Sequence, residues 1–93
     1  MLNVNEYFDG KVMSIAFEGP DGPVTSGVMA PGEYTFNTSQ NELMKITCGE
    51  LVVRLPGSSD WQSFPAGTEF SVAANLAFDL KVSKPTAYLC FYS

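Results

Sequence analysis

The sequence contains no histidine, so the side chains that can take part in chemistry are carboxylates, hydroxyls, aromatic rings, four lysines, one arginine and two thiols. One carboxylate stands in a recognisable pattern: Phe36-x-Thr38, three residues, Glu42, six residues, Gly49. A transition-metal site needs several convergent nitrogen, oxygen or sulfur donors, and one glutamate does not supply them. We therefore expect a site that works without a metal or another cofactor.

The spacing itself resembles that of cupins, in which His-x-His, a glutamate and a later histidine bind iron, manganese or nickel. A second block, Gly67, five residues, Ala73, four residues, Phe78, fits the same frame. In this chain the three imidazole positions are held by Phe36, Thr38 and Phe78, so only Glu42 remains as a ligand. The frame is kept while its usual metal chemistry is lost.

Alternation of apolar and polar residues, with period two, dominates the chain and predicts strands rather than helices. Turn residues, including two Pro-Gly pairs, separate the alternating runs, and Gly49 is expected to supply a turn that needs a positive φ. About eight or nine short strands, with no helix, predict one all-β domain over residues 1–93: a small cupin, a jelly-roll-like β-barrel. The segment from Asn5 to Gly10 does not alternate, and we expect a turn or an added edge that covers the barrel mouth.

Composition excludes several partners. The net charge is −5, and the five cations are scattered, whereas binding to a phosphate backbone needs a basic face, so no nucleic acid is expected. No apolar run is long enough to cross a membrane. The N-terminus lacks a signal-peptide pattern, and Cys48 and Cys90 read as buried free thiols, so we expect a cytoplasmic protein.

Several short stretches resemble one bacterial family along nearly the whole chain. These are Asn5-Glu6-Tyr7-Phe8, Gly10-Lys11-Val12, Gly27-Val28-Met29, Gly32-Glu33-Tyr34-Thr35-Phe36, Glu42 with Met44, Asp60-Trp61-Gln62 and Tyr88-Leu89-Cys90. The chain thereby resembles the single-domain, cupin-type pyrimidine/purine nucleoside phosphorylases. One departure is Ala73, where cupins commonly have proline.

The resemblance implies a pentosyltransferase, that is, a glycosyltransferase acting on nucleosides. Inorganic phosphate, the co-substrate, would replace a purine or pyrimidine base at the anomeric carbon and release ribose 1-phosphate and the free base. The resemblance also favours a homodimer, which suits a core this small. The alternative is a non-catalytic cupin that binds a sugar, a nucleotide or another small ligand.

Two residues are predicted to be catalytic. Lys11, in the family-like Gly-Lys-Val stretch, is the preferred cation for phosphate; Arg54, by its alternation with Leu51 and Val53, is expected on an outer face. Glu42 is expected to hydrogen-bond ribose hydroxyls and offset positive charge on the sugar, the alternative being a solvated loop glutamate. No residue is identified as the general acid.

The predicted substrate-binding residues are mostly aromatic, because stacking accepts every base. For each ring the alternative is packing in the core. Thr38 is expected to contribute to phosphate binding, and Glu33 is a second choice for the role of Glu42. The complete set is Tyr34, Phe36, Thr38, Glu33, Tyr7 and Trp61, with Phe78 assigned to the core.

Overall fold

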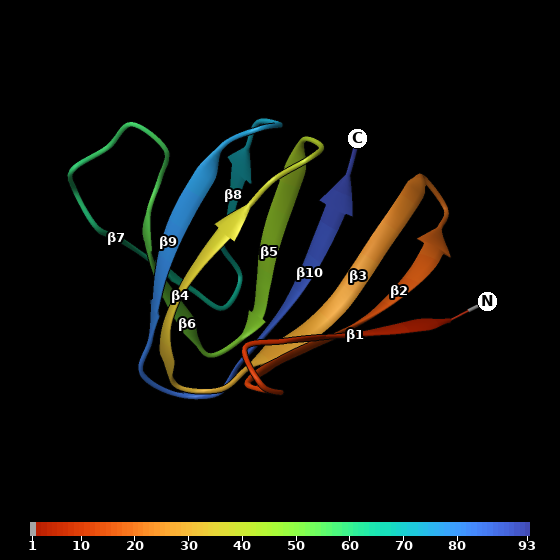
Figure 1. The fold of residues 1–93 in the computed structure, drawn as a ribbon, viewed down its shortest axis with the longest axis horizontal. Helices are drawn as coiled ribbons and strands as arrows, with labels where there is room; N and C mark the ends of the chain where they lie inside the picture. Colours follow the sequence, from red (N-terminus) through yellow and green to blue (C-terminus); the bar gives the residue numbers. More distant parts are fainter. Residues whose placement is uncertain (1) are drawn as a thin grey trace.

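The computed structural model describes residues 2–93 and contains two antiparallel sheets that face each other (Figure 1). The larger sheet has the strand order β1-β2-β3-β10-β5-β8, and the smaller has the order β4-β9-β6-β7. The strands are β1 (Asn3–Tyr7), β2 (Val12–Gly19), β3 (Gly22–Met29), β4 (Gly32–Asn37), β5 (Glu42–Cys48), β6 (Glu50–Arg54), β7 (Gln62–Pro65), β8 (Glu69–Val72), β9 (Ala77–Val82) and β10 (Thr86–Tyr92).

The all-β prediction is confirmed, with two differences. Residues 2–93 form ten strands rather than eight or nine, and the two sheets are separate rather than one closed barrel. The extra strand is β1, which the sequence left as a turn or an edge. It pairs with β2 in register from Asn3 opposite Ala16 to Tyr7 opposite Val12. In the described part of the chain, no helix has the length and apolarity that a membrane crossing requires.

The core lies between the sheets and follows the predicted alternation. In β9, Phe78, Leu80 and Val82 are buried while Asp79 and Lys81 face outward. In β10, Tyr88 and Cys90 are buried on the inner face, and the partly buried Tyr92 packs against the core. This alternation determines which side chains reach the space between the sheets.

One part of the outer surface is apolar. Val4 pairs with Ile15, and Met13 pairs with Val28, so these four side chains share one face across β1, β2 and β3. Each of the four is between 43% and 65% exposed. We call this surface the outer apolar face.

Candidate functional site

A cavity of about 120 Å³ lies between the two sheets, and we call it the inter-sheet cavity. The larger sheet and its edge strand supply Tyr7, Ser14, Thr25, Met29, Glu42, Met44, Tyr88, Cys90 and Tyr92, while the smaller sheet supplies Phe36, Asn37 and Phe78. All its ionisable groups therefore come from one sheet. Opposite them stand Phe36 and Phe78, which stack with ring centroids 6.0 Å apart.

Glu42 is the one carboxylate that lines this cavity among residues 2–93, and it is half-buried. The thiol of Cys90 donates a hydrogen bond to Glu42 Oε1, with sulfur and oxygen 3.5 Å apart. Burial raises the pKa of Glu42, and the Cys90 hydrogen bond opposes this shift in part. Glu42 therefore keeps its proton to a higher pH than a solvated glutamate does.

The neighbouring groups are held in their neutral forms. Burial, with the negative charge of Glu42 as a smaller cause, raises the pKa of the Cys90 thiol to about 12, so it is a weak donor rather than a nucleophile at neutral pH. Burial also raises the pKa of both Tyr88 and Tyr92. The hydroxyl of Tyr92 lies 3.2 Å from Oγ1 of Thr25. The wall around Glu42 thus offers hydroxyl groups for hydrogen bonding to a polar ligand.

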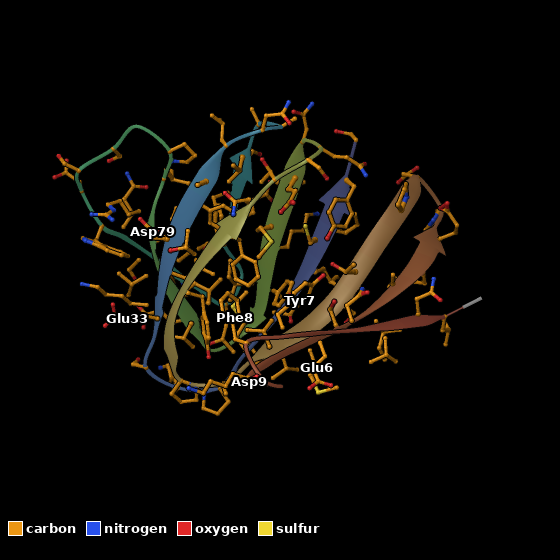
Figure 2. The ribbon with its side chains drawn as sticks, in the orientation of Figure 1. Glu6, Tyr7, Phe8, Asp9, Glu33 and Asp79 are labelled. Carbon is orange, nitrogen blue, oxygen red and sulfur yellow. The ribbon has the colours of Figure 1, made fainter. Side chains whose placement is uncertain are left out.

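The β1–β2 turn brings further aromatic rings to the cavity. Tyr7, which lines it, meets Phe36 edge-on at 6.1 Å between centroids. Phe8 packs on Tyr34 at 4.9 Å and on Phe36 at 5.4 Å. In Figure 2, Tyr7 and Phe8 lie on the side of β1 that faces the strands of the two sheets, and Glu6 lies on the other side. The sequence interpretation named Tyr7 and missed Phe8, although its place in an apparent turn was a usable signal.

Three predicted residues line the cavity together: Glu42, Phe36 and Tyr7. Two others are buried but have structural partners. The hydroxyl of Tyr34 donates to the carbonyl of Ala30 at 2.6 Å. The hydroxyl of Thr38 donates to the carbonyl of Ala73 at 2.7 Å and accepts from the N–H of Leu76 at 3.0 Å. Neither hydroxyl is directed to the cavity, because both form hydrogen bonds with backbone groups.

The remaining predicted residues lie outside the cavity. Lys11 follows the β1–β2 turn with an exposed side chain, and its N–H donates to the carbonyl of Phe8 at 3.2 Å. Glu33 is exposed on the smaller sheet, opposite Lys81 in register. Figure 2 shows Glu33 and Asp79 on the outer side of β4 and β9. These positions separate the predicted cation and the second carboxylate from Glu42.

Trp61 packs on this same outer side, between two cations. Its ring lies 4.2 Å from Lys81 Nζ and 5.0 Å from Arg54 Cζ, measured to the ring centroid. Arg54 also pairs with Asp79, with Nη2 and Oδ2 2.6 Å apart, as expected for a residue on an outer face. This cluster ties β6, β7 and β9 together and is separate from the cavity.

The described residues contain no group of three or more histidine, cysteine, aspartate or glutamate side chains arranged to hold a metal ion. The polar groups of the cavity are one carboxyl, one thiol, one amide and several hydroxyls. Such a set can hydrogen-bond a sugar and stabilise positive charge on it, while the facing rings can pack against a flat apolar group.

Comparisons with known proteins agree with these features. A profile of the pyrimidine/purine nucleoside phosphorylase family matches residues 2–92. A pyrimidine/purine nucleoside phosphorylase of Pseudomonas fluorescens is 61% identical over 92 residues, which cover 99% of this chain and 98% of the relative. A protein of the same name from Rhodopirellula baltica is 56% identical, with coverage of 99% and 100%.

Solved structures support the fold. A crystal structure of a protein of unknown function from Vibrio parahaemolyticus superposes with a TM-score of 0.93 at 43% identity, covering 97% of this chain and 96% of that one. An RmlC-like cupin from Shewanella frigidimarina superposes with a TM-score of 0.75 at 12% identity, covering 100% of this chain and 84% of that one, and shows the fold alone. The match of residues 2–92 to the family profile, with named relatives 56–61% identical along the chain, places this chain in the pyrimidine/purine nucleoside phosphorylase family.

Proposed function

We propose that this protein is a metal-independent pentosyltransferase that cleaves both purine and pyrimidine nucleosides with inorganic phosphate. An oxygen of phosphate forms a bond to the anomeric carbon, and the bond from that carbon to the base nitrogen breaks. The electron pair stays on the base, which takes up a proton, and the products are ribose 1-phosphate and the free base. The transition state carries positive charge on the sugar.

The observation that carries this proposal is the pairing of one half-buried carboxyl with facing aromatic rings in a single cavity, in a chain of this family. Glu42 would hydrogen-bond ribose hydroxyls and, as the carboxylate, offset the sugar's positive charge. Tyr7 and Phe36 would stack on the base, which suits broad base acceptance because every base has a π-face. The donor set of the cavity, without histidine, supports a reaction that needs no metal ion.

Phosphate needs a cation and hydrogen-bond donors near the cavity. Lys11 is the cation that we propose for it, because the turn that carries Lys11 also carries Tyr7 and Phe8 at the edge of the cavity. Hydroxyl groups such as those of Thr25 and Tyr92 would complete the anion's hydrogen bonds. We further propose that the protein acts in the cytoplasm as a homodimer joined through the outer apolar face.

The deciding experiment is incubation of the purified protein with uridine and with adenosine, with and without phosphate, while free base is measured by chromatography. Base release that requires phosphate, from both nucleosides, is the expected result, and a chelator should leave its rate unchanged. A well-folded protein that releases no base from either nucleoside refutes the enzyme. Release without phosphate indicates a hydrolase instead.

A further inference from the structure

The inter-sheet cavity is too small for the substrates that the proposed function requires. Small-molecule sites usually measure roughly 300–1,000 Å³, whereas this one measures about 120 Å³. A nucleoside and a phosphate ion together cannot enter that volume while the wall keeps its present position. Enclosure of both substrates between the sheets would therefore require part of the wall to move.

The strands that form the cavity wall differ in how firmly they are held by neighbouring strands. Met29, Met44 and Tyr88 lie in β3, β5 and β10, which have hydrogen-bonded neighbours on both sides. Tyr7 lies in β1, an edge strand that is paired only with β2, and its side chain is 44% exposed. Elements with few buried contacts and exposed backbone open at the lowest free energy. The other edge strand of the wall, β4, contains the buried Tyr34, whereas no residue of β1 is buried. The β1–β2 turn, Tyr7 to Gly10, is thus the part of the wall that opens most easily.

This turn has an uncommon backbone for its sequence. Phe8 and Asp9 both have positive φ, 52° and 58°, in the four-residue loop between the paired residues Tyr7 and Val12. Glycine, asparagine and aspartate adopt positive φ most readily, and a bulky residue with positive φ costs about 1–3 kcal/mol. Strain of this kind persists where surrounding contacts impose it, and it is common at ligand clamps. Here the contacts are those of the Phe8 ring with Tyr34 and Phe36.

We propose that the β1–β2 turn is an aromatic lid over the nucleoside site, with Phe8 as its anchor and Tyr7 as the ring that closes on the base. In the closed position the anchor packs on Tyr34 and Phe36 of β4, and so holds both Tyr7 and Phe36 at the cavity. Opening separates Phe8 from β4 and enlarges the cavity for the base. The inference rests on the proposed function for the identity of the ligand.

The kinetic test uses a substitution that the backbone accepts. Phe8→Gly removes the anchor but keeps the positive φ at no steric cost, so the turn still forms. We expect the KM for uridine and for adenosine to rise about tenfold, the size of one lost stacking contact, with kcat changed less than about threefold. Phe8→Tyr should restore the KM. The matched control is Asp9→Gly, which relieves the adjacent strain and keeps the ring, and should leave the KM as in the wild type.

A second readout follows the lid directly. The N–H groups of Gly10 and Lys11 donate to the carbonyls of Tyr7 and Phe8, and we expect uridine, without phosphate, to slow their hydrogen exchange. The lid is refuted if the wild type turns over nucleosides and Phe8→Gly has the same KM. It is also refuted if saturating uridine leaves the exchange of these two N–H groups unchanged. Either result leaves the proposed function intact. Absence of wild-type turnover overturns the proposed function. If Phe8→Gly does not fold, the exchange measurement on the wild type decides.

Discussion

Gly27 of β3 lies directly against the ring of Tyr88 of β10, so closely that a Cβ atom at Gly27 would stand 2.5 Å from both Cζ and the hydroxyl oxygen of Tyr88. The two residues are opposite each other in the β3–β10 register. The missing side chain of Gly27 is therefore the space that the Tyr88 ring fills, and Tyr88 in turn forms part of the cavity wall.

Gly27→Ala should accordingly displace the Tyr88 ring and deform the cavity. Overpacking of this kind costs about 1–3 kcal/mol of the free energy of unfolding, measurable by chemical denaturation. The KM for nucleosides should rise as well. Ser26→Ala, on the opposite face of the same strand, is the control and should change neither quantity. If Gly27→Ala were as stable as the wild type, the Tyr88 ring would be able to adopt another position without cost.

Glu42→Gln should lower activity and raise stability at neutral pH. Activity should fall by about a hundredfold, as is usual when a group that acts on the transition state is lost. In the wild type, activity should fall with decreasing pH as Glu42 takes up a proton, and this acid limb should lie at higher pH than for an ordinary glutamate, because burial raises the pKa of Glu42. The variant's pH–rate profile should lack that limb.

Glu42 supports activity at neutral pH, but its ionised carboxylate lowers the stability of the folded protein there. A carboxyl whose pKa is raised in the folded state binds its proton more tightly there, so the stabilisation from Glu42 is complete below the unfolded-state pKa and is lost as the pH rises through the folded-state pKa. Glu42→Gln should therefore have the higher Tm at pH 7, and the difference should disappear in acid. A lower Tm for the variant at pH 7 would contradict the burial cost.

Trp61→Phe should leave catalysis nearly unchanged, because Trp61 packs on Arg54 and Lys81 outside the cavity. We expect kcat/KM within about twofold of the wild type. The loss of stability should be no more than about 0.5–1 kcal/mol, the usual size of an exposed cation–π contact, because phenylalanine keeps a weaker one. Steady-state kinetics and thermal unfolding measure both. A large loss of kcat/KM in a variant as stable as the wild type would show that Trp61 contributes to substrate binding after all.

Ile15→Glu should separate the proposed homodimer. The charge would stand in the middle of the outer apolar face, where Ile15 pairs with Val4 and adjoins Met13, and desolvation of a carboxylate there opposes association. Light scattering should report a dimer for the wild type and a monomer for the variant. Glu18→Ala, on an exposed residue of the same strand, should remain dimeric. A monomeric wild type would refute the dimer outright.

The alternation of the strands was enough to predict much of the fold. The inward positions of Phe78 and Leu80, with Asp79 outside, are confirmed, and Gly49 has the positive φ that its place in a turn demanded. Pattern alone did not reveal that the strands form two open sheets, and it left the segment from Asn5 to Gly10 as either a turn or an added edge, where the structure has the edge strand β1. Register across distant strands depends on long-range packing, which local sequence does not specify.

The site was harder to predict than the fold. Glu42 lines the cavity as its spacing suggested. Tyr34 is buried, as alternation predicted, but it does not line the cavity, and its hydroxyl donates to the carbonyl of Ala30. Cys90 was interpreted only as a buried free thiol, since nothing local shows that β10 runs beside β5 and brings Cys90 to Glu42. Phe8 was missed because its contacts with β4 depend on a turn conformation that phenylalanine seldom adopts.

The two sheets supply different kinds of side chain to the cavity, and this has a consequence for engineering. Phe36 and Phe78 belong to the smaller sheet, whereas Glu42 and its hydroxyl-bearing neighbours belong to the larger one. Replacement of a ring on one wall leaves the hydrogen bonds of the other wall in place. Libraries of substitutions restricted to β4 and β9 should therefore change which bases are accepted, while the groups proposed to bind the sugar stay as they are.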